Sequence, residues 1–303
     1  MLPTVRRLAA LLLLVSCGKS TPPSLGSSSA PVIAATPLPG GTSCGALSCT
    51  QFDTLSAALD AALASKPLVV GVGEAHAQKG KEGVASSAKH FTDEVLPLLS
   101  GRTSDLVVEL MAPGRKPDGS SCAETTAAVK EQQKVVTERQ APTNQNEYVV
   151  MGEAAKKLGI VPDLLRPTCD ELAAIEKAGD DMIPLTLETI ARLTRVKVER
   201  LLERNQKSDA DRGKLIFTYG GALHNDLVVP PERASWTYGP ALSKLTGGRY
   251  VELDLYVADF VEDTDAWKKL PWYPHWSRER LGGKITVFKP SEGSWVIILP
   301  RAK

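Results

Sequence analysis

The chain has 303 residues, of which 43% are hydrophobic, and its 36 Lys and Arg residues nearly balance its 35 Asp and Glu residues. This composition, with 24 Gly and 21 Pro and no internal repeat, excludes a disordered or collagen-like chain. A formal net charge of +1 without a basic stripe argues against a nucleic-acid binder, because phosphate contacts require an excess of basic residues.

The N-terminal segment has the features of an export signal. Arg6 and Arg7 precede an apolar run over residues 8–15, which is too short to span a bilayer. The run ends in Leu-Val-Ser-Cys17, which resembles a bacterial lipobox; the alternative is a short helix that ends in a cysteine by chance. The resemblance implies a signal peptide over residues 1–16, lipid attachment to Cys17, and anchorage in a bacterial cell envelope, at the outer membrane.

A low-complexity segment follows the expected lipid anchor. From residue 18 to residue 43, 18 of 26 residues are Ser, Pro, Thr or Gly. Such a segment cannot bury enough apolar surface to offset its chain entropy. We therefore expect a lipidated Cys17 and a flexible tether over residues 17–43, followed by one folded domain over residues 44–303.

Within this domain, short apolar runs alternate with longer segments of helical periodicity. The predicted strands are 68–72, 106–110, 160–165, 214–219 and 250–257. The predicted helices are 52–63, 85–99, 123–139, 147–158 and 172–205, the last divided at Pro184. Residues 285–289 and 295–299 predict a C-terminal β-hairpin. The alternation predicts an α/β fold with a mostly parallel central sheet and helices on both faces. No other segment is long and apolar enough to predict a spanning helix.

Four cysteines remain once Cys17 is set aside as the lipid anchor. An even number of cysteines in an exported protein favours disulfides, although three pairings are possible and free thiols remain the alternative. We favour Cys44 with Cys49, which are close in sequence, and hence Cys122 with Cys169. A zinc site is less favoured, because the chain has no C-x₂-C pair.

Two of the four histidines follow apolar strands in the pattern G-x-x-H, at His76 and His224. In open α/β sheets, ligands bind beyond the carboxyl ends of the strands, where both histidines are expected to lie. Glu109 lies in another apolar strand, and burying its carboxylate is costly unless it is paired, hydrogen-bonded or bound to a metal. Each residue alone is more often structural. Their coincidence predicts a site formed by Glu74, His76, Glu109 and His224.

These motifs, with His90 in the following predicted helix, resemble the superfamily that joins ChaN-type haem-uptake lipoproteins, erythromycin esterases and Tiki/TraB proteins. The resemblance spans roughly Pro67 to Leu227. It implies an α/β fold, and the members of this superfamily include hydrolases, some of them metal-dependent, and a haem binder.

The three branches match to different degrees. Ala77 replaces the Asp that follows the ChaN-type motif, and Glu74 and His76 are one residue closer together than in the esterase-type motif. The Tiki/TraB type has two G-x-x-H motifs and an acidic residue, which fits His76, His224 and Glu109. The resemblance therefore supports the superfamily more than any single branch.

By position, the resemblance makes His76, Glu109 and His224 ligands of a divalent metal, or general acid and base groups together with Glu74. Imidazole and carboxylate groups suit divalent metals, and a metal lowers the pKa of bound water towards 7. Without a metal, a histidine oriented by a glutamate can still deprotonate water. The chain has no G-x-S-x-G elbow or cysteine nucleophile motif, which favours attack by water.

The leading hypothesis is therefore a lipid-anchored hydrolase that acts on an ester, lactone or peptide bond of a small molecule or peptide. The alternative is a haem- or iron-binding lipoprotein without catalysis. A third hypothesis is a family member that acts only as a binding scaffold, because a fold alone does not establish activity.

An aromatic segment near the C-terminus contains Trp272, Tyr273, His275 and Trp276. One interpretation is a substrate-binding flap that stacks on haem or on an apolar substrate. The other is a surface loop that its aromatic rings attach to the core, which amphipathic aromatic residues commonly do.

Overall fold

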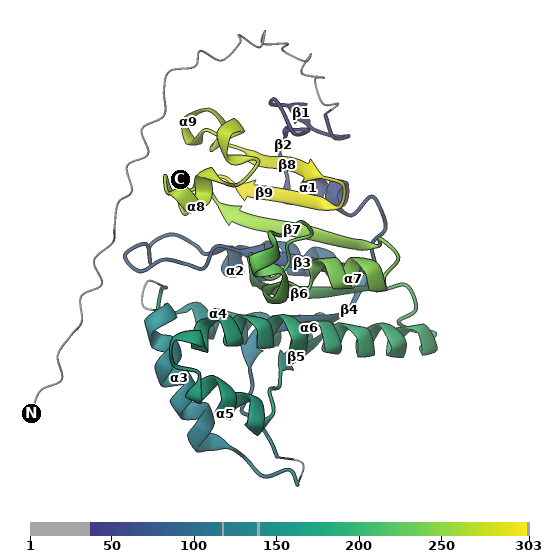
Figure 1. Cartoon of the computed structure of the whole chain (residues 1–303). Helices are drawn as coiled ribbons and strands as arrows, with labels where there is room; N and C mark the ends of the chain where they lie inside the picture. The colour runs from purple at the N-terminus through teal and green to yellow at the C-terminus, as the bar shows by residue number, and fades with distance from the viewer. Residues whose placement is uncertain (1–36, 117, 138–139, 302–303) are drawn as a thin grey trace, which may run out of the picture. The chain divides into compact units, whose positions relative to one another are not determined.

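A computed structural model describes residues 37–116, 118–137 and 140–301 (Figure 1). The predictions for the signal peptide, for lipidation of Cys17 and for most of the tether lie outside these residues. Thr42 and Ser43, which the sequence assigned to the tether, pair with Gln51 and Thr50 in the sheet. None of the described helices is long and apolar enough to cross a membrane.

One mixed sheet organises the described residues. Its nine strands lie in the order β1-β2-β8-β9-β7-β3-β6-β4-β5. The strands are β1 Thr42–Ser43, β2 Thr50–Phe52, β3 Val69–Glu74, β4 Thr103–Met111, β5 Val161–Leu165, β6 Leu215–Gly221, β7 Tyr250–Val257, β8 Ile285–Ser291 and β9 Ser294–Leu299. The pairs from β9 through β7, β3, β6 and β4 to β5 are parallel, whereas β1, β2 and β8 pair antiparallel. The predicted α/β class, the mostly parallel sheet and the C-terminal hairpin are confirmed.

Helices are present in every segment predicted to be helical and also, without having been predicted, within residues 231–245 and 265–281, whereas Phe52 of the predicted helix 52–63 belongs to strand β2. The helices are α1 Leu55–Ala62, α2 Ser87–His90, η1 Phe91–Val95, η2 Leu96–Leu99, α3 Ala123–Thr137, α4 Asn144–Lys157, α5 Cys169–Lys177, η3 Gly179–Asp181, α6 Met182–Lys207, η4 Pro231–Trp236, α7 Gly239–Leu245, α8 Asp265–Lys268, η5 Tyr273–His275 and α9 Arg278–Leu281. The predicted helix 85–99 consists of an α, a π and a 3₁₀ segment in succession. Pro184 lies in the first turn of α6, where its missing N–H costs no hydrogen bond, and the break between helices precedes it.

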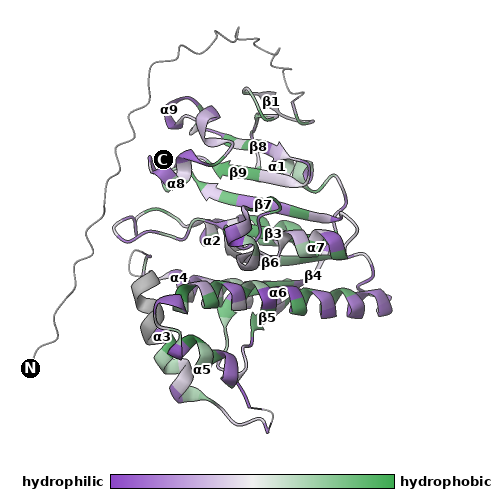
Figure 2. Cartoon of the chain, viewed as in Figure 1, coloured by the Kyte–Doolittle hydropathy of each residue, from purple (hydrophilic) through white to green (hydrophobic). Residues whose placement is uncertain are grey.

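Alternate residues of β3 contribute to two different hydrophobic clusters. Val70 and Val72 belong to a cluster that includes residues of α1, α2, η1 and α4. Val69 belongs to another cluster, which includes residues of α6 and α7. Along its length α6 mixes hydrophobic and hydrophilic residues, as expected for a helix with one apolar face (Figure 2). Successive apolar residues of this strand therefore pack in separate parts of the core.

Gly73 makes room beside the end of β3. A Cβ atom at this position would lie 2.5 Å from Asn225 Oδ1 and 2.7 Å from Asp254 Oδ1. Any side chain here would displace these buried groups. The glycine of the G-x-x-H motif therefore permits close packing against β7 and against the loop that carries His224.

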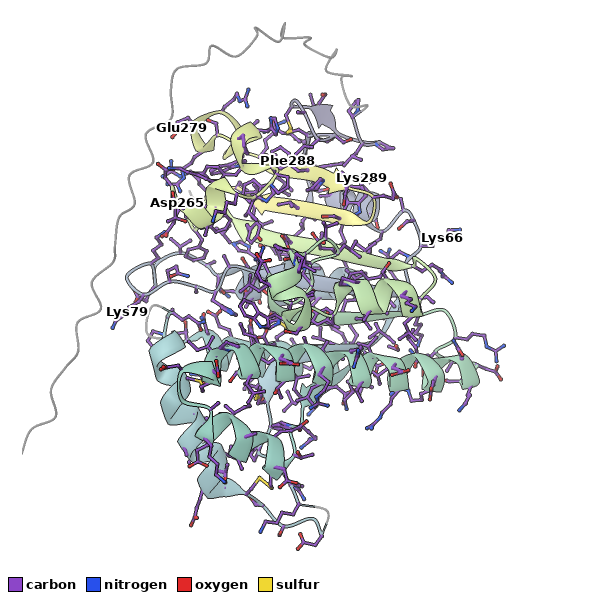
Figure 3. All side chains as sticks on the ribbon, in the orientation of Figure 1. Lys66, Lys79, Asp265, Glu279, Phe288 and Lys289 are labelled. Carbon is purple, nitrogen blue, oxygen red and sulfur yellow. A yellow bond between two sulfur atoms is a disulfide. The ribbon has the colours of Figure 1, made fainter. Side chains whose placement is uncertain are left out.

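The structure contains both disulfides that the sequence favoured (Figure 3). Cys44 and Cys49 are joined with their Cα atoms 5.0 Å apart. Cys122 and Cys169 are joined with their Cα atoms 5.8 Å apart, which connects the N-terminal ends of α3 and α5.

Candidate active site

Glu74 is a buried carboxylate at the end of β3, and three donors surround it. Its Oε1 atom lies 2.9 Å from His76 Nδ1 and 2.7 Å from the Tyr148 hydroxyl, and its Oε2 atom lies 2.7 Å from the Tyr219 hydroxyl. Tyr148 comes from α4 and Tyr219 from β6. The residue is only 3% exposed, so these hydrogen bonds replace the water that its carboxylate loses on folding.

This arrangement fixes which nitrogen of His76 carries a proton. The carboxylate of Glu74 accepts hydrogen bonds, so the Nδ1 atom of His76 donates and the Nε2 atom is the basic nitrogen of the neutral ring. Burial alone would lower the pKa of His76, but the hydrogen bond and charge of Glu74 and the charge of Glu109 outweigh it and raise the pKa. His76 is therefore an oriented base whose Nε2 atom is left available.

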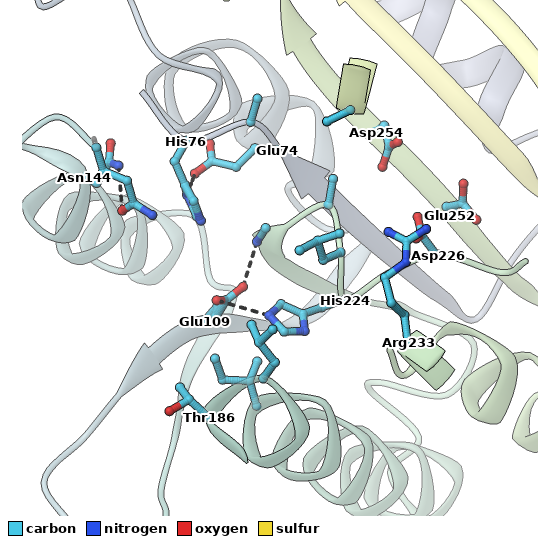
Figure 4. Close-up of a pocket in the computed structure, with 18 of the residues that line it drawn as sticks. Glu74, His76, Glu109, Asn144, Thr186, His224, Asp226, Arg233, Glu252 and Asp254 are labelled. Carbon is cyan, nitrogen blue, oxygen red and sulfur yellow. Dashed lines mark hydrogen bonds and ion pairs between the residues drawn. The ribbon is translucent and has the colours of Figure 1, made fainter. Parts of the chain in front are cut away.

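Glu109 and His224 form a second pair, carried by β4 and by the loop after β6 (Figure 4). Glu109 Oε2 accepts a hydrogen bond of 2.7 Å from the backbone N–H of Gly221, and Glu109 Oε1 lies 3.6 Å from His224 Nε2. His224 Nδ1 donates to the Trp236 carbonyl oxygen at 2.6 Å. Since a carbonyl oxygen only accepts, the Nδ1 atom of His224 carries a proton, and Nε2 is the ring nitrogen that faces Glu109.

The charges of the second pair stabilise each other. Burial would lower the pKa of His224, but the charge and hydrogen bond of Glu109 and the Trp236 carbonyl raise it. Burial would likewise raise the pKa of Glu109, but His224, His76 and the Gly221 N–H together lower it. The pair therefore favours an imidazolium beside a carboxylate.

The two pairs lie next to each other at Gly221. A Cβ atom built on this glycine would lie 3.2 Å from His76 Nε2 and 3.8 Å from Glu109 Oε2. Because glycine has no Cβ atom, this position is open, and its distances from His76 Nε2 and Glu109 Oε2 suit contact with a small bound molecule. The structure therefore brings together all four residues that the sequence predicted for the site.

All four residues line one cavity of about 890 Å³. One part of its wall comes from α3, α5 and α6, and another comes from β7, from the loop before η4 and from the segment around Trp272. This volume is in the range of pockets that bind small organic ligands.

Three further carboxyl groups line this cavity that the sequence did not predict, those of Asp226, Glu252 and Asp254. Burial and the charge of Glu252 raise the pKa of Asp226 to about 7, against the opposing effects of Arg233 and His224. Burial, followed by the neighbouring acidic groups, also raises the pKa of Asp254. The signal was present in the sequence, because Glu252 and Asp254 alternate with apolar residues in the predicted strand 250–257.

The aromatic segment is divided between the core and the surface. Trp272 is 1% exposed, packs near Tyr256 and Phe288, and lines the cavity. Tyr273, His275 and Trp276 do not belong to the cavity lining found in the described part of the chain. The structure therefore brings one of these four predicted substrate-binding residues to the cavity.

The described residues fit a metal centre poorly. Within this part of the chain, no group of three or more His, Cys, Asp or Glu side chains is arranged to hold a metal ion. His76 Nδ1 is bonded to Glu74, and both oxygens of Glu109 face other protein groups. Of the donors that the sequence assigned to a metal, those of Glu109 and His224 pair with protein groups, whereas His76 pairs with Glu74 through Nδ1 and its Nε2 atom lies beside Gly221.

Comparisons with known proteins add little to this geometry. No family model and no curated protein matches the chain. One solved structure, described as "The structure of the type III effector HopBA1", is 11% identical, with a TM-score of 0.37 over 83% of this chain and 97% of that chain. A likeness of this size carries no argument about function.

Replacing Glu74 with Gln should lower the pKa of His76, because the substitution removes the nearest negative charge while burial continues to disfavour the imidazolium. Nuclear magnetic resonance titration of the imidazole protons can measure this, since the chain has only four histidines. The His224 signal provides the comparison, because Glu109 raises its pKa and the charge of His76 lowers it, so the pKa of His224 should not fall with that of His76. An unchanged pKa of His76 would contradict the assigned pairing.

The raised pKa of His76 also sets the sign of a stability change. Its ordinary value is 6.5, so the stabilisation by Glu74 and Glu109 is fully present below that pH and is lost as the pH rises through the higher folded value. Urea unfolding across this pH range should show a smaller loss of stability in the Glu74→Gln variant.

Proposed function

We propose that this protein is a hydrolase in which His76 activates a water molecule for attack on a carbonyl group. The observation that carries the proposal is the position at Gly221, which His76 Nε2 and Glu109 Oε2 flank. The proposal uses no metal, because among the described residues no group of three or more His, Cys, Asp or Glu side chains is arranged to hold one. The resemblance of the sequence motifs to the ChaN, erythromycin esterase and Tiki/TraB superfamily supports the same class of reaction.

In the proposed reaction, water lies at Gly221 and donates a proton to His76 Nε2 as its oxygen attacks the substrate carbonyl. Glu74 stabilises the imidazolium that forms on His76, through the hydrogen bond to Nδ1. The two ring nitrogens of His224 face Glu109 and the Trp236 carbonyl oxygen, so His224 stabilises the developing negative charge on the carbonyl oxygen through its positive charge, which Glu109 favours, and not through a hydrogen bond. The imidazolium of His76 then returns its proton to the leaving group, so that an ester and water yield an acid and an alcohol.

The cellular setting is also a proposal. Two disulfides support an oxidising compartment, which agrees with export and with lipid attachment at Cys17. In this setting, the cavity would accept its substrate outside the cytoplasm.

We also infer that helices cover both faces of the sheet. Residues of α1 and α4 share one hydrophobic cluster with Val70 and Val72 of β3, whereas residues of α6 and α7 share another cluster with Val69.

Replacing His76 with Gln should lower kcat for ester hydrolysis by roughly 10²- to 10⁴-fold, the usual contribution of a general base. The measurement is the release of p-nitrophenol from p-nitrophenyl acetate, followed by a panel of lactones and peptides. His90→Gln is the matched control, because His90 pairs with Glu94 on α2 and η1 and does not line the cavity. Equal rates for His76→Gln and the unaltered protein would contradict the proposal.

Replacing Gly221 with Ala tests the position of the water directly. The methyl group would lie 3.2 Å from His76 Nε2, while the backbone N–H that binds Glu109 is retained. We expect hydrolysis to be lost while the thermal unfolding temperature changes little. Gly83→Ala provides the matched control, because a Cβ atom there meets no other atom within 4 Å. Full activity of Gly221→Ala would show that water attacks from elsewhere.

Haem binding is the second candidate function, favoured by the size of the cavity and by the available Nε2 atom of His76. His76 could supply one axial nitrogen, but the carboxyl groups of Asp226, Glu252 and Asp254 line the same cavity, and placing the negative propionate groups of haem beside them would disfavour their ionised forms further. The fit is therefore partial.

A haemin titration separates the two functions. Haem binding predicts a Soret shift that saturates at one equivalent and is lost in the His76→Gln variant. Absence of a shift at stoichiometric haemin would contradict haem binding.

A further inference from the structure

The cavity that His76 and Glu109 line also has apolar lining residues on α3, α5 and α6. Leu110 and Met111, which follow Glu109 at the end of β4, line it as well. Val129 of α3 and Leu172 of α5 belong to a common hydrophobic cluster and also line the cavity. The apolar wall is therefore continuous with the candidate catalytic groups.

Helix α6 contributes one stripe to this wall. Ile183, Leu187 and Ile190 are spaced by four and three residues, so they lie on the same face of the helix, and all three line the cavity. Ile183 is 39% exposed, although it is apolar. A ligand that covered this stripe would remove apolar surface from water, which is favourable.

On α3 and α6, the polar side chains that line the cavity are two threonines and one lysine. The hydroxyl group of Thr126 donates to the Cys122 carbonyl oxygen within its own helix, and the Thr186 hydroxyl lies 3.9 Å from Met182 Sδ. Lys130 lines the cavity but is exposed to solvent. The hydroxyl groups are therefore directed at the helices that carry them, which suits a hydrocarbon ligand better than a sugar or a peptide backbone.

The disulfide between Cys122 and Cys169 holds two parts of this wall together. It joins the beginning of α3 to the beginning of α5, and Val129 and Leu172 belong to the same cluster as Cys122. Binding an apolar group to a wall that is already held in place costs less conformational entropy than ordering a flexible one.

We propose that the region between α3, α5 and α6 binds an aliphatic acyl group, and that the substrate is an ester of a medium- or long-chain acid. This inference rests on the proposed function for the bond that is cleaved, but binding of the acyl group can be measured without hydrolysis. The carbonyl carbon lies next to the water at Gly221, and the acyl chain extends past Leu110 along the stripe of Ile183, Leu187 and Ile190.

The binding experiment uses octanamide, a neutral amide with an eight-carbon chain, and the His76→Gln variant to prevent turnover. Each buried methylene contributes roughly a three- to fourfold gain in affinity, so octanamide should bind at least about 100-fold more tightly than acetamide. Isothermal titration calorimetry gives both dissociation constants. Equal affinity for octanamide and acetamide would overturn the proposed acyl site.

Two double variants locate the site. Ile183→Gln with Leu187→Gln removes two apolar side chains from the cavity wall and should weaken octanamide binding at least about tenfold, with acetamide binding unchanged. Val149→Gln with Val150→Gln is the matched control, because these valines are 49% and 54% exposed on α4 and do not line the cavity. An equal effect of both double variants would contradict the location.

Hydrolysis of p-nitrophenyl esters distinguishes this inference from the proposed function. If the proposed function and the acyl site are both correct, kcat/KM rises from the acetate to the octanoate ester. The Ile183→Gln and Leu187→Gln double variant then lowers only the rate with the octanoate ester. Octanamide binding without hydrolysis of any ester would contradict the proposed function and support the acyl site. Hydrolysis at equal rates for both esters, without octanamide binding, would overturn the acyl site alone.

Discussion

The buried carboxylate of Glu74 is the constraint on which the site depends. An ionised carboxylate removed from water is costly to the fold unless donors replace its hydration. Tyr148, Tyr219 and His76 supply those donors from α4, β6 and the loop after β3. The same contacts that make Glu74 tolerable also fix the orientation and the protonated nitrogen of His76. One set of hydrogen bonds therefore stabilises the buried carboxylate and also orients the histidine that we propose as a base.

Parallel pairing alone would not bring the two histidine–glutamate pairs together. Along β3, Val70 and Val72 belong to one hydrophobic cluster, and Glu74 is the next residue in this series of every second position. Along β4, Val108 belongs to the same cluster, so Glu109, which directly follows it, lies on the other face of the sheet. The two carboxylates therefore leave their strands towards opposite faces. Gly220 has no Cβ atom to obstruct Glu109, whose side chain passes over the end of β6 and reaches the Gly221 N–H. The glycines of β6 allow the pairs to meet beyond the strand ends.

The sequence predicted what depends on local patterns and missed what depends on packing. The strand 250–257, the terminal hairpin and the four site residues follow from apolar runs and from the position of polar residues at strand ends. Nothing in the sequence marks Tyr148 as a partner of Glu74, because that contact joins α4 to β3 over 74 residues. Likewise, β2 is a strand of only three residues that exists through its pairing with β8. The π segment after α2 also carries no local signal.

Opposing effects of burial and charge on the pKa of His76 explain why a proposed base in this cavity has two carboxylates near it. Burial disfavours the imidazolium, and a base whose pKa fell far below neutrality would accept a proton from water poorly. Glu74 and Glu109 reverse this effect and place the pKa of His76 above its ordinary value. His224 limits the effect of Glu109, because its imidazolium neutralises part of that charge. The second pair therefore tunes the first, and the raised pKa favours the proposed transfer of a proton to the Nε2 atom of His76, which lies beside Gly221.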